Sequence, residues 1–335
     1  MAQHFLLSAN ARSLSLIKIA KMSDAQARET FSKIRWFETD GKPVCPVCGI
    51  VDKAYIVRGG KQFKCKECSS FYSVTSDTVF HGHKLSLQTM LIAIALFTNS
   101  AKGLSALQLS RDLDVQYKTA WVLLHKIRES LMDYQEGREF DGVCEMDGVY
   151  VNGYIRPRNH IKTRIDRRKA HKPNKRVIIS LRERHRYTKG ARRTKTFVLR
   201  SENPDDVYKI ANNHIKRGTE IHTDESNGFS ILATHYNHQV VNHAVEYSGP
   251  NGENNNQSES YNARFRRMQY GQHHKLGNLY LAEYANEIAY REDTRRLDNG
   301  FIFRNILKRC LDNGISNEFC GYWQGNHRVA ERLGA

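Results

Sequence analysis

The sequence predicts a multidomain α+β protein. Its parts are a small cysteine-rich module near the N-terminus, a helical segment, and an α/β domain with a mixed sheet. Three observations predict this division. Two CxxC pairs lie within residues 45–68, apolar residues recur at helical spacing within 85–132, and strand-like runs alternate with helical ones from residue 144 onward. At 335 residues the chain is long enough for two or three domains and a well-buried core.

The charge of the chain is strongly positive and unevenly distributed. The formal net charge is +17, and residues 154–200 hold 18 Lys and Arg against two acids, Asp166 and Glu183, which gives 18 − 2 = +16. We call residues 154–200 the basic segment. Such a concentration favours binding to a nucleic-acid backbone over a merely solubilising loop. The longest apolar run, 90–97, is too short to span a bilayer, and the N-terminus lacks an export signal, so we expect a cytoplasmic protein without membrane contact.

The first helix is expected over residues 25–36, because Ser23 and Asp24 provide a cap directly before it. Residues 1–21 show no clear periodicity. Met22 stands immediately before the cap and is a candidate for the true start of the chain.

The two cysteine pairs predict a structural zinc site. Cys45 and Cys48 form one CxxC unit, and Cys65 and Cys68 form the second one. Between them, residues 55–64 read as a hairpin with Gly-Gly at its turn, and residues 75–80 as a further strand. Four thiolates close a tetrahedral site with no open position, so one Zn²⁺ would stabilise the fold rather than catalyse. We therefore expect a helix plus zinc ribbon over residues 23–80, which could bind either DNA or protein.

Residues 81–135 are expected to form a helical segment. Helices are predicted over 85–98, 104–113 and 118–132, with a turn over residues 114–117. A short helix, a turn and a second helix favour a helix-turn-helix, whose reading helix would begin with residues 116–119. The alternative is an ordinary helical bundle.

The rest of the chain alternates strands and helices. A helix over 205–216 follows Asn203-Pro204, a good helix opening, and another follows the polar run 254–258. Strands are expected over residues 144–151, 177–182, 194–199, 220–223 and 239–242.

Three acids fall at informative places in this order. Asp147 lies within the first strand, Asp224 directly after the fourth strand, and Glu259 in the first turns of the late helix. Two Asp on strands and one Glu on a helix can hold two divalent metals for phosphoryl transfer on nucleic acid. Hard carboxylate oxygens suit Mg²⁺ or Mn²⁺. Cys310 and Cys320, near the C-terminus, read as buried thiols rather than ligands.

The motifs resemble those of a bacterial insertion-sequence transposase of the DDE type, in the branch that places a zinc ribbon before the catalytic domain. The resemblance runs from about residue 31 to residue 296. Its blocks are VCPVCG (44–49), KTAW (118–121), MDGVYV (146–151), HTD (222–224), VNH (241–243), NQSES (256–260) with Arg266-Arg267, and YANE (284–287) with Arg291. Two positions depart from the pattern: Gly148 stands where many relatives have an acid, and Arg266 where many have Lys.

The resemblance implies a ribonuclease-H-like catalytic domain over residues 140–298, followed by a C-terminal tail of unknown role over 299–335. In that domain Asp147 would bridge two Mg²⁺ or Mn²⁺ ions, and Asp224 and Glu259 would each hold one. Arg266 would grip a phosphate. The implied function is cleavage at the ends of an insertion sequence, followed by attack of the freed 3′-OH on target DNA. Implied partners are the terminal inverted repeats, the target DNA and further copies of the chain.

Two other functions remain as alternatives. One is a non-catalytic DNA-binding regulator built from the ribbon and the helix-turn-helix, against which the intact acidic triad argues. The other is a ribonuclease-H-like nuclease or resolvase without strand transfer, against which the N-terminal DNA-binding modules argue.

Overall fold

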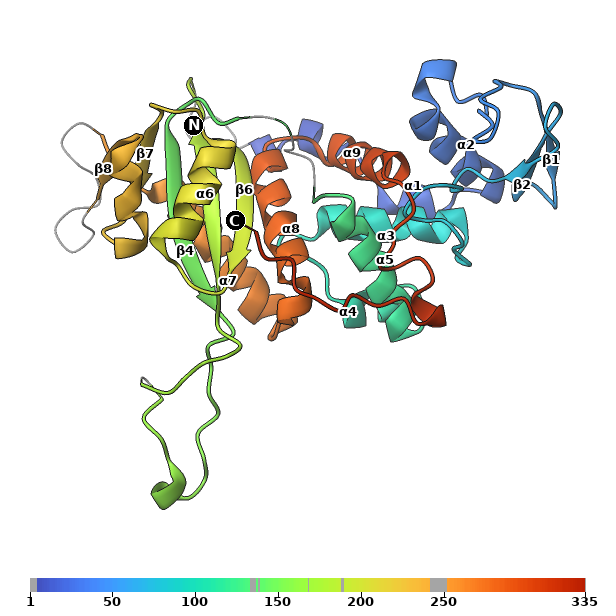
Figure 1. Ribbon diagram of the computed structural model, residues 1–335. Coiled ribbons are helices and arrows are strands. Elements are labelled where there is room, and N and C mark those ends of the chain that lie inside the picture. Colours follow the sequence, from blue (N-terminus) through green and yellow to red (C-terminus); the bar gives the residue numbers. More distant parts are fainter. Residues whose placement is uncertain are drawn as a thin grey trace. The chain divides into compact units, whose positions relative to one another are not determined.

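The computed structural model describes residues 5–132, 137, 139–167, 169–187, 190–241 and 252–334 (Figure 1). The chain divides into two compact units: unit 1 is Met1–Tyr134 with Thr294–Arg328, and unit 2 is Gln135–Asp293 with Val329–Ala335. Residues 299–335, expected as one tail, are thus shared between the units. Among the described helices, none is long and apolar enough to cross a membrane.

Unit 1 begins with short helical elements that the sequence pattern did not predict. They are two 3₁₀ turns, Phe5–Leu7 and Ala9–Ala11, and helix α1 (Leu16–Ala20), which packs against α3 (Leu87–Asn99). Helix α2 (Asp24–Arg35) starts as expected: the Ser23 hydroxyl accepts from the Gln26 N–H, and the Gln26 side chain accepts from the Ser23 N–H.

The ribbon is a three-stranded antiparallel sheet of β1 (Ala54–Val57), β2 (Gln62–Cys65) and β3 (Phe71–Tyr72). Gly59 and Gly60 take φ values of 63° and 86° at the hairpin turn, where glycine is favoured. The prediction of a strand over residues 75–80 is wrong, because this segment forms turns. Arg35 holds it in that shape by donating to the carbonyls of Ser73, Val74 and Ser76.

The helical part of unit 1 consists of α3, α4 (Ala106–Asp112), α5 (Tyr117–Glu129) and α9 (Asn299–Asp312), with 3₁₀ turns at Phe37–Thr39 and Tyr322–Gln324. Asp114 lies in the turn between α4 and α5 with φ 51°, a conformation that Asp tolerates better than most residues. Helix α9, which lies in the region expected as a tail, packs on α2, α3 and α5. Helix α5, which packs mainly on α4 and also on α9, is largely buried beyond its first turn.

Unit 2 is built on a mixed five-stranded sheet in the order β6-β5-β4-β7-β8. Its strands are β4 (Cys144–Val151), β5 (Arg176–Arg184), β6 (Ala191–Leu199), β7 (Glu220–Thr223) and β8 (Asn237–Val240). β4, β5 and β6 are antiparallel neighbours, whereas β4-β7 and β7-β8 are parallel. All five expected strands are present; Asn242, the expected end of the last strand, lies outside the described residues.

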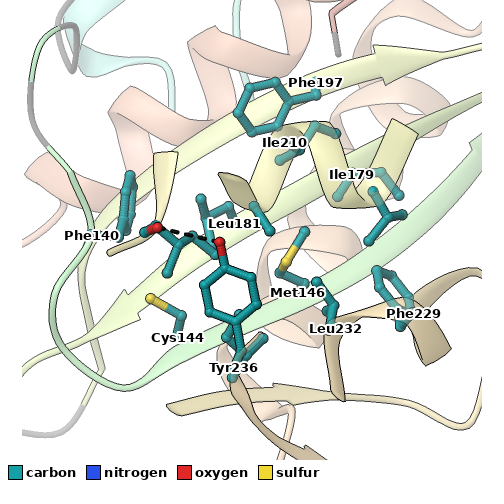
Figure 2. Packing of buried hydrophobic residues seen from close by; sticks show 14 of the residues in the cluster. Phe140, Cys144, Met146, Ile179, Leu181, Phe197, Ile210, Phe229, Leu232 and Tyr236 are labelled. Carbon is teal, nitrogen blue, oxygen red and sulfur yellow. Dashed lines mark hydrogen bonds between the residues drawn. The ribbon is translucent and has the colours of Figure 1, made fainter. Parts of the chain in front are cut away.

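Helices cover both faces of this sheet. On one face, α6 (Pro204–His214) and the 3₁₀ segment Asn227–Thr234 enclose a cluster of buried apolar side chains (Figure 2). At its edge the Tyr236 hydroxyl donates to the carbonyl of Ile215 at 3.4 Å. The other face packs against α7 (Asn256–Met268) and α8 (Leu281–Thr294). A π-helical turn (Gln269–His273) and 3₁₀ turns at Ile161–Thr163 and Asn278–Tyr280 complete the unit.

Candidate functional site

The four cysteines predicted as zinc ligands come together in the ribbon. Their sulfur atoms all lie within 4.8 Å of one another, with 3.6 Å separating Cys45 from Cys68 and Cys48 from Cys65. Cys45 and Cys65 are buried and Cys48 and Cys68 exposed. Four soft sulfur donors at this spacing fit a structural Zn²⁺. In the described part of the chain, no other three or more His, Cys, Asp or Glu ligand atoms are so close. Cys310 and Cys320 therefore stay outside this centre.

The second candidate site lies beside the central strand β4. Strand β7 pairs with β4 only at Cys144 and Glu145, so Asp147 lies just beyond the paired stretch. Because β4 and β7 are parallel, Asp224, which follows β7 directly, lies toward the same end of the sheet. Helix α7 packs on β4 and β5 and carries Glu259 in its first turn. The fold thus directs the three predicted acids toward one region of unit 2.

The charges of these acids reach one another. Burial raises the pKa of Asp147 to about 7, and the negative charges of Asp224, Glu202 and Glu259 add to that rise. The Asp147 carboxylate accepts hydrogen bonds from the Gly148 N–H and from the Asn262 side-chain amide, both at 2.7 Å. The oxygens of the three predicted acids do not form a group within 4.8 Å in the described chain. The three carboxylates therefore interact through their charges but do not form a closed coordination shell.

The residues around Asp147 fit a hard divalent cation. Carboxylates are the ligands that Mg²⁺ and Mn²⁺ prefer, and a bound cation would offset both the burial of the Asp147 charge and its repulsion by Asp224, Glu202 and Glu259. In addition, the Oδ1 atom of Asn262, whose amide contacts Asp147, is buried with no hydrogen-bond partner in the described chain. A polar atom left in this state has spare capacity for a bound water or ion.

Glu145 has a role that the sequence pattern did not reveal. Its fully buried carboxylate accepts the backbone N–H groups of Gln257 (2.7 Å) and Ser258 (3.1 Å) and pairs with Arg184 at 2.6 Å. The polar run expected to cap α7 does so only in part: the Asn254 side chain accepts from the Asn256 N–H at 3.3 Å, whereas Asn255 makes no side-chain capping bond. Instead, an acid on β4 caps the helix that carries Glu259. A contact between elements far apart in sequence leaves no local signal.

The basic segment divides into two groups. Its strand residues are largely structural: Arg176, Arg182, Arg184 and Arg193 pair with Glu331, Glu292, Glu145 and Glu183. Among the described residues, most of its exposed cations lie in residues 152–175, which connect β4 to β5 and reach away from the sheet (Figure 1). Arg186, Arg192 and Arg200 are exposed outside that range. We call residues 152–175 the basic loop. Its Arg168 lies outside the described residues.

Arg266, predicted to grip a phosphate, is exposed on α7 seven residues after Glu259, which is also exposed. Of the motif 241–243, Val241 is buried, and Asn242 and His243 lie outside the described residues.

Two family models match the chain. The ISXO2-like transposase domain covers residues 139–293, and the transposase zinc-ribbon domain covers residues 22–70. No curated protein matches it. A zinc ribbon followed by this catalytic domain defines a DDE transposase. The chain belongs to the IS1595 family of ISXO2-like transposases. Membership implies an enzyme that binds DNA.

Proposed function

We propose that the protein binds the ends of its insertion sequence and catalyses metal-dependent DNA cleavage and strand transfer. The observation that supports this proposal is that the charges of Asp224 and Glu259 act on Asp147 beside the central strand, inside the region matched by the transposase domain. The strand order, with three antiparallel strands followed by two parallel ones, supports a ribonuclease-H-like assignment for this domain.

In this proposal Asp147, Asp224 and Glu259 would hold the divalent ions, Mg²⁺ or Mn²⁺, with Asp147 as the ligand that both ions share. Such ions would supply activation of a water and charge neutralisation at the leaving 3′ oxygen. The chain's own residues fix the frame: Asn262 orients the Asp147 carboxylate, and Glu145 holds α7 and hence Glu259. Arg266, on the exposed side of the same helix, binds a DNA phosphate.

DNA binding is assigned to two surfaces. In unit 1, the α4–turn–α5 arrangement supports a helix-turn-helix whose exposed first turn, Gln116 to Lys118, would meet base edges. In unit 2, the basic loop would neutralise phosphates without regard to sequence. Further copies of the chain would assemble on the paired element ends.

The test uses full-length protein and three labelled DNA substrates: a duplex with the element's inverted repeat, a duplex with the repeat scrambled, and a four-way junction. The proposal expects Mg²⁺-dependent nicking and joining of the repeat duplex alone. Binding without nicking would indicate a regulator. Nicking of the junction without joining would indicate a resolvase. Either result would contradict the proposal.

A further inference from the structure

Glu202 lies in the acidic site although no sequence motif pointed to it. It follows the end of β6 and is half-buried. Its carboxylate accepts a hydrogen bond from the hydroxyl of Ser226. The backbone N–H of Ser226 in turn donates to Oδ1 of Asp224 at 3.1 Å. A chain of two hydrogen bonds therefore connects Glu202 to the second acid of the proposed catalytic triad.

Two glycines leave the space that Glu202 occupies. A Cβ atom added to Gly148 would lie 2.2 Å from Oε2 of Glu202, and one added to Gly228 would lie 2.7 Å from its Cγ. Both separations are far shorter than any van der Waals contact. Gly148 directly follows Asp147, and Gly228 lies two residues after Ser226. A larger side chain at either position would displace the Glu202 carboxylate, so the absence of a side chain there matters for the site.

The position of Glu202 calls for an explanation beyond packing. A half-buried carboxylate beside Asp147 and Asp224 adds a like charge to a site that already repels itself, and the nearby charge of Lys175 offsets this repulsion only in part. A structural role alone would be met by a neutral acceptor of the Ser226 hydroxyl. A carboxylate is favoured once a dication is bound, because it then both holds the turn and adds attraction to the ion.

From this geometry we propose that Glu202 is a positioning carboxylate of the metal site: through Ser226 it holds Asp224 in place for the divalent cation. The inference rests on the proposed function, since it assigns Glu202 to the same metal site. Residues that orient metal ligands change metal affinity by about 10- to 100-fold when removed.

The experiment measures Mn²⁺ binding to zinc-loaded full-length protein without DNA, by the loss of the free-ion electron paramagnetic resonance signal. Glu202→Ala and Ser226→Ala should each weaken binding by about 10- to 100-fold. Because both substitutions remove the same hydrogen bond between Ser226 and Glu202, the double variant should bind Mn²⁺ no more weakly than the weaker single variant. Glu202→Gln retains an acceptor for Ser226 and should recover part of the loss. Asp205→Asn, which removes an exposed charge three residues away, is the matched control and should bind like wild type.

Wild-type Mn²⁺ affinity in Glu202→Ala, or losses that add fully in the double variant, would overturn the inference. Amide hydrogen exchange without metal checks that each variant keeps the fold of unit 2, so a lost fold is not mistaken for lost positioning. Asp147→Asn distinguishes a failure of the role given to Glu202 from a failure of the proposed metal site. If it abolishes Mn²⁺ binding while Glu202→Ala does not, only the role of Glu202 fails. If Asp147→Asn also binds normally, the proposed metal site itself fails.

Discussion

The carboxylate of Glu145 accepts the backbone N–H of Gln257 at 2.7 Å, which joins the central strand β4 to the first turn of α7. An acid at a helix N-terminus is favourable because the unpaired N–H groups there carry partial positive charge. This acid also neutralises Arg184. The same contact keeps Glu145 from replacing Asp147, two residues further along the strand.

Glu145→Gln should therefore destabilise unit 2. Arg184 loses its charged partner and α7 loses its anionic cap, at a cost of about 3 kcal/mol. Native-state hydrogen exchange of the β4 and α7 amides measures the change. Asp141→Asn, which breaks the exposed pair with Arg186, is the control and should cost less than about 1 kcal/mol. Equal effects of the two variants would contradict the capping role.

The cysteine cluster predicts one zinc per chain. Cys45→Ser should release the metal and unfold the ribbon, because so small a sheet depends on its metal for stability, while unit 2 stays folded. Metal analysis and hydrogen exchange of the two units measure both effects. Cys320→Ser changes a thiol outside the cluster and should keep the zinc. Freshly purified wild-type protein without zinc would disprove the assignment.

Much of this architecture could be predicted from the sequence, because the signals are local. The ribbon follows from two CxxC pairs around a Gly-Gly turn, and β4 and β7 occupy the predicted ranges since strand-like runs are bounded by turn residues. The remainder depends on long-range contacts. Helix α9 packs on helices that end at least 170 residues earlier in the chain, which no local pattern reveals.

In the candidate site, too, some residues follow from local sequence motifs and others depend on long-range contacts. Asp147, Asp224 and Glu259 could be named from their motifs, whereas Glu202 could not, because its place depends on space left by Gly148 and Gly228. For the basic segment, the sequence predicts binding to a nucleic-acid backbone. In the structure, strand pairing instead brings several of its arginines onto buried acids such as Glu292 and Glu183.

The exposed part of the basic loop should bind DNA without sequence preference. Replacing Arg167, Arg168 and Lys169 with Ala should weaken binding to all duplexes alike. It should lower the slope of log K against log salt by about 0.9 for each phosphate that is no longer neutralised. Gel-shift titrations at several salt concentrations measure this. Lys209→Ala, at a cation of unit 2 paired with Asp206, is the control. An effect confined to the element's own ends would mean that the loop reads bases.

Unit 2 should lose stability in mild acid through His214. Burial, with the nearby charge of Lys195, lowers the pKa of His214 to about 4, against about 6.5 in an unfolded chain. Between these values the unfolded state binds more protons, so the stabilisation is present above about pH 6.5 and is lost as pH falls toward 4. His214→Phe, which can keep the ring stacking on Phe197, should reduce this pH dependence in hydrogen exchange. His171→Asn, at an exposed histidine, should leave the pH dependence unchanged. An unchanged slope of stability against pH in His214→Phe would contradict the prediction.

The most direct test of the proposed function is strand transfer by Asp147→Asn. The substitution keeps the shape of the side chain and removes the charge that would bridge two Mg²⁺ ions, and Glu145 cannot replace it because it is bound to α7. On a short duplex carrying the element end, nicking and joining should fall by several orders of magnitude, as in Asp224→Asn and Glu259→Gln, because the three ligands act as one unit. A gel-shift on the same duplex should show unchanged binding. Wild-type joining by Asp147→Asn would contradict the account.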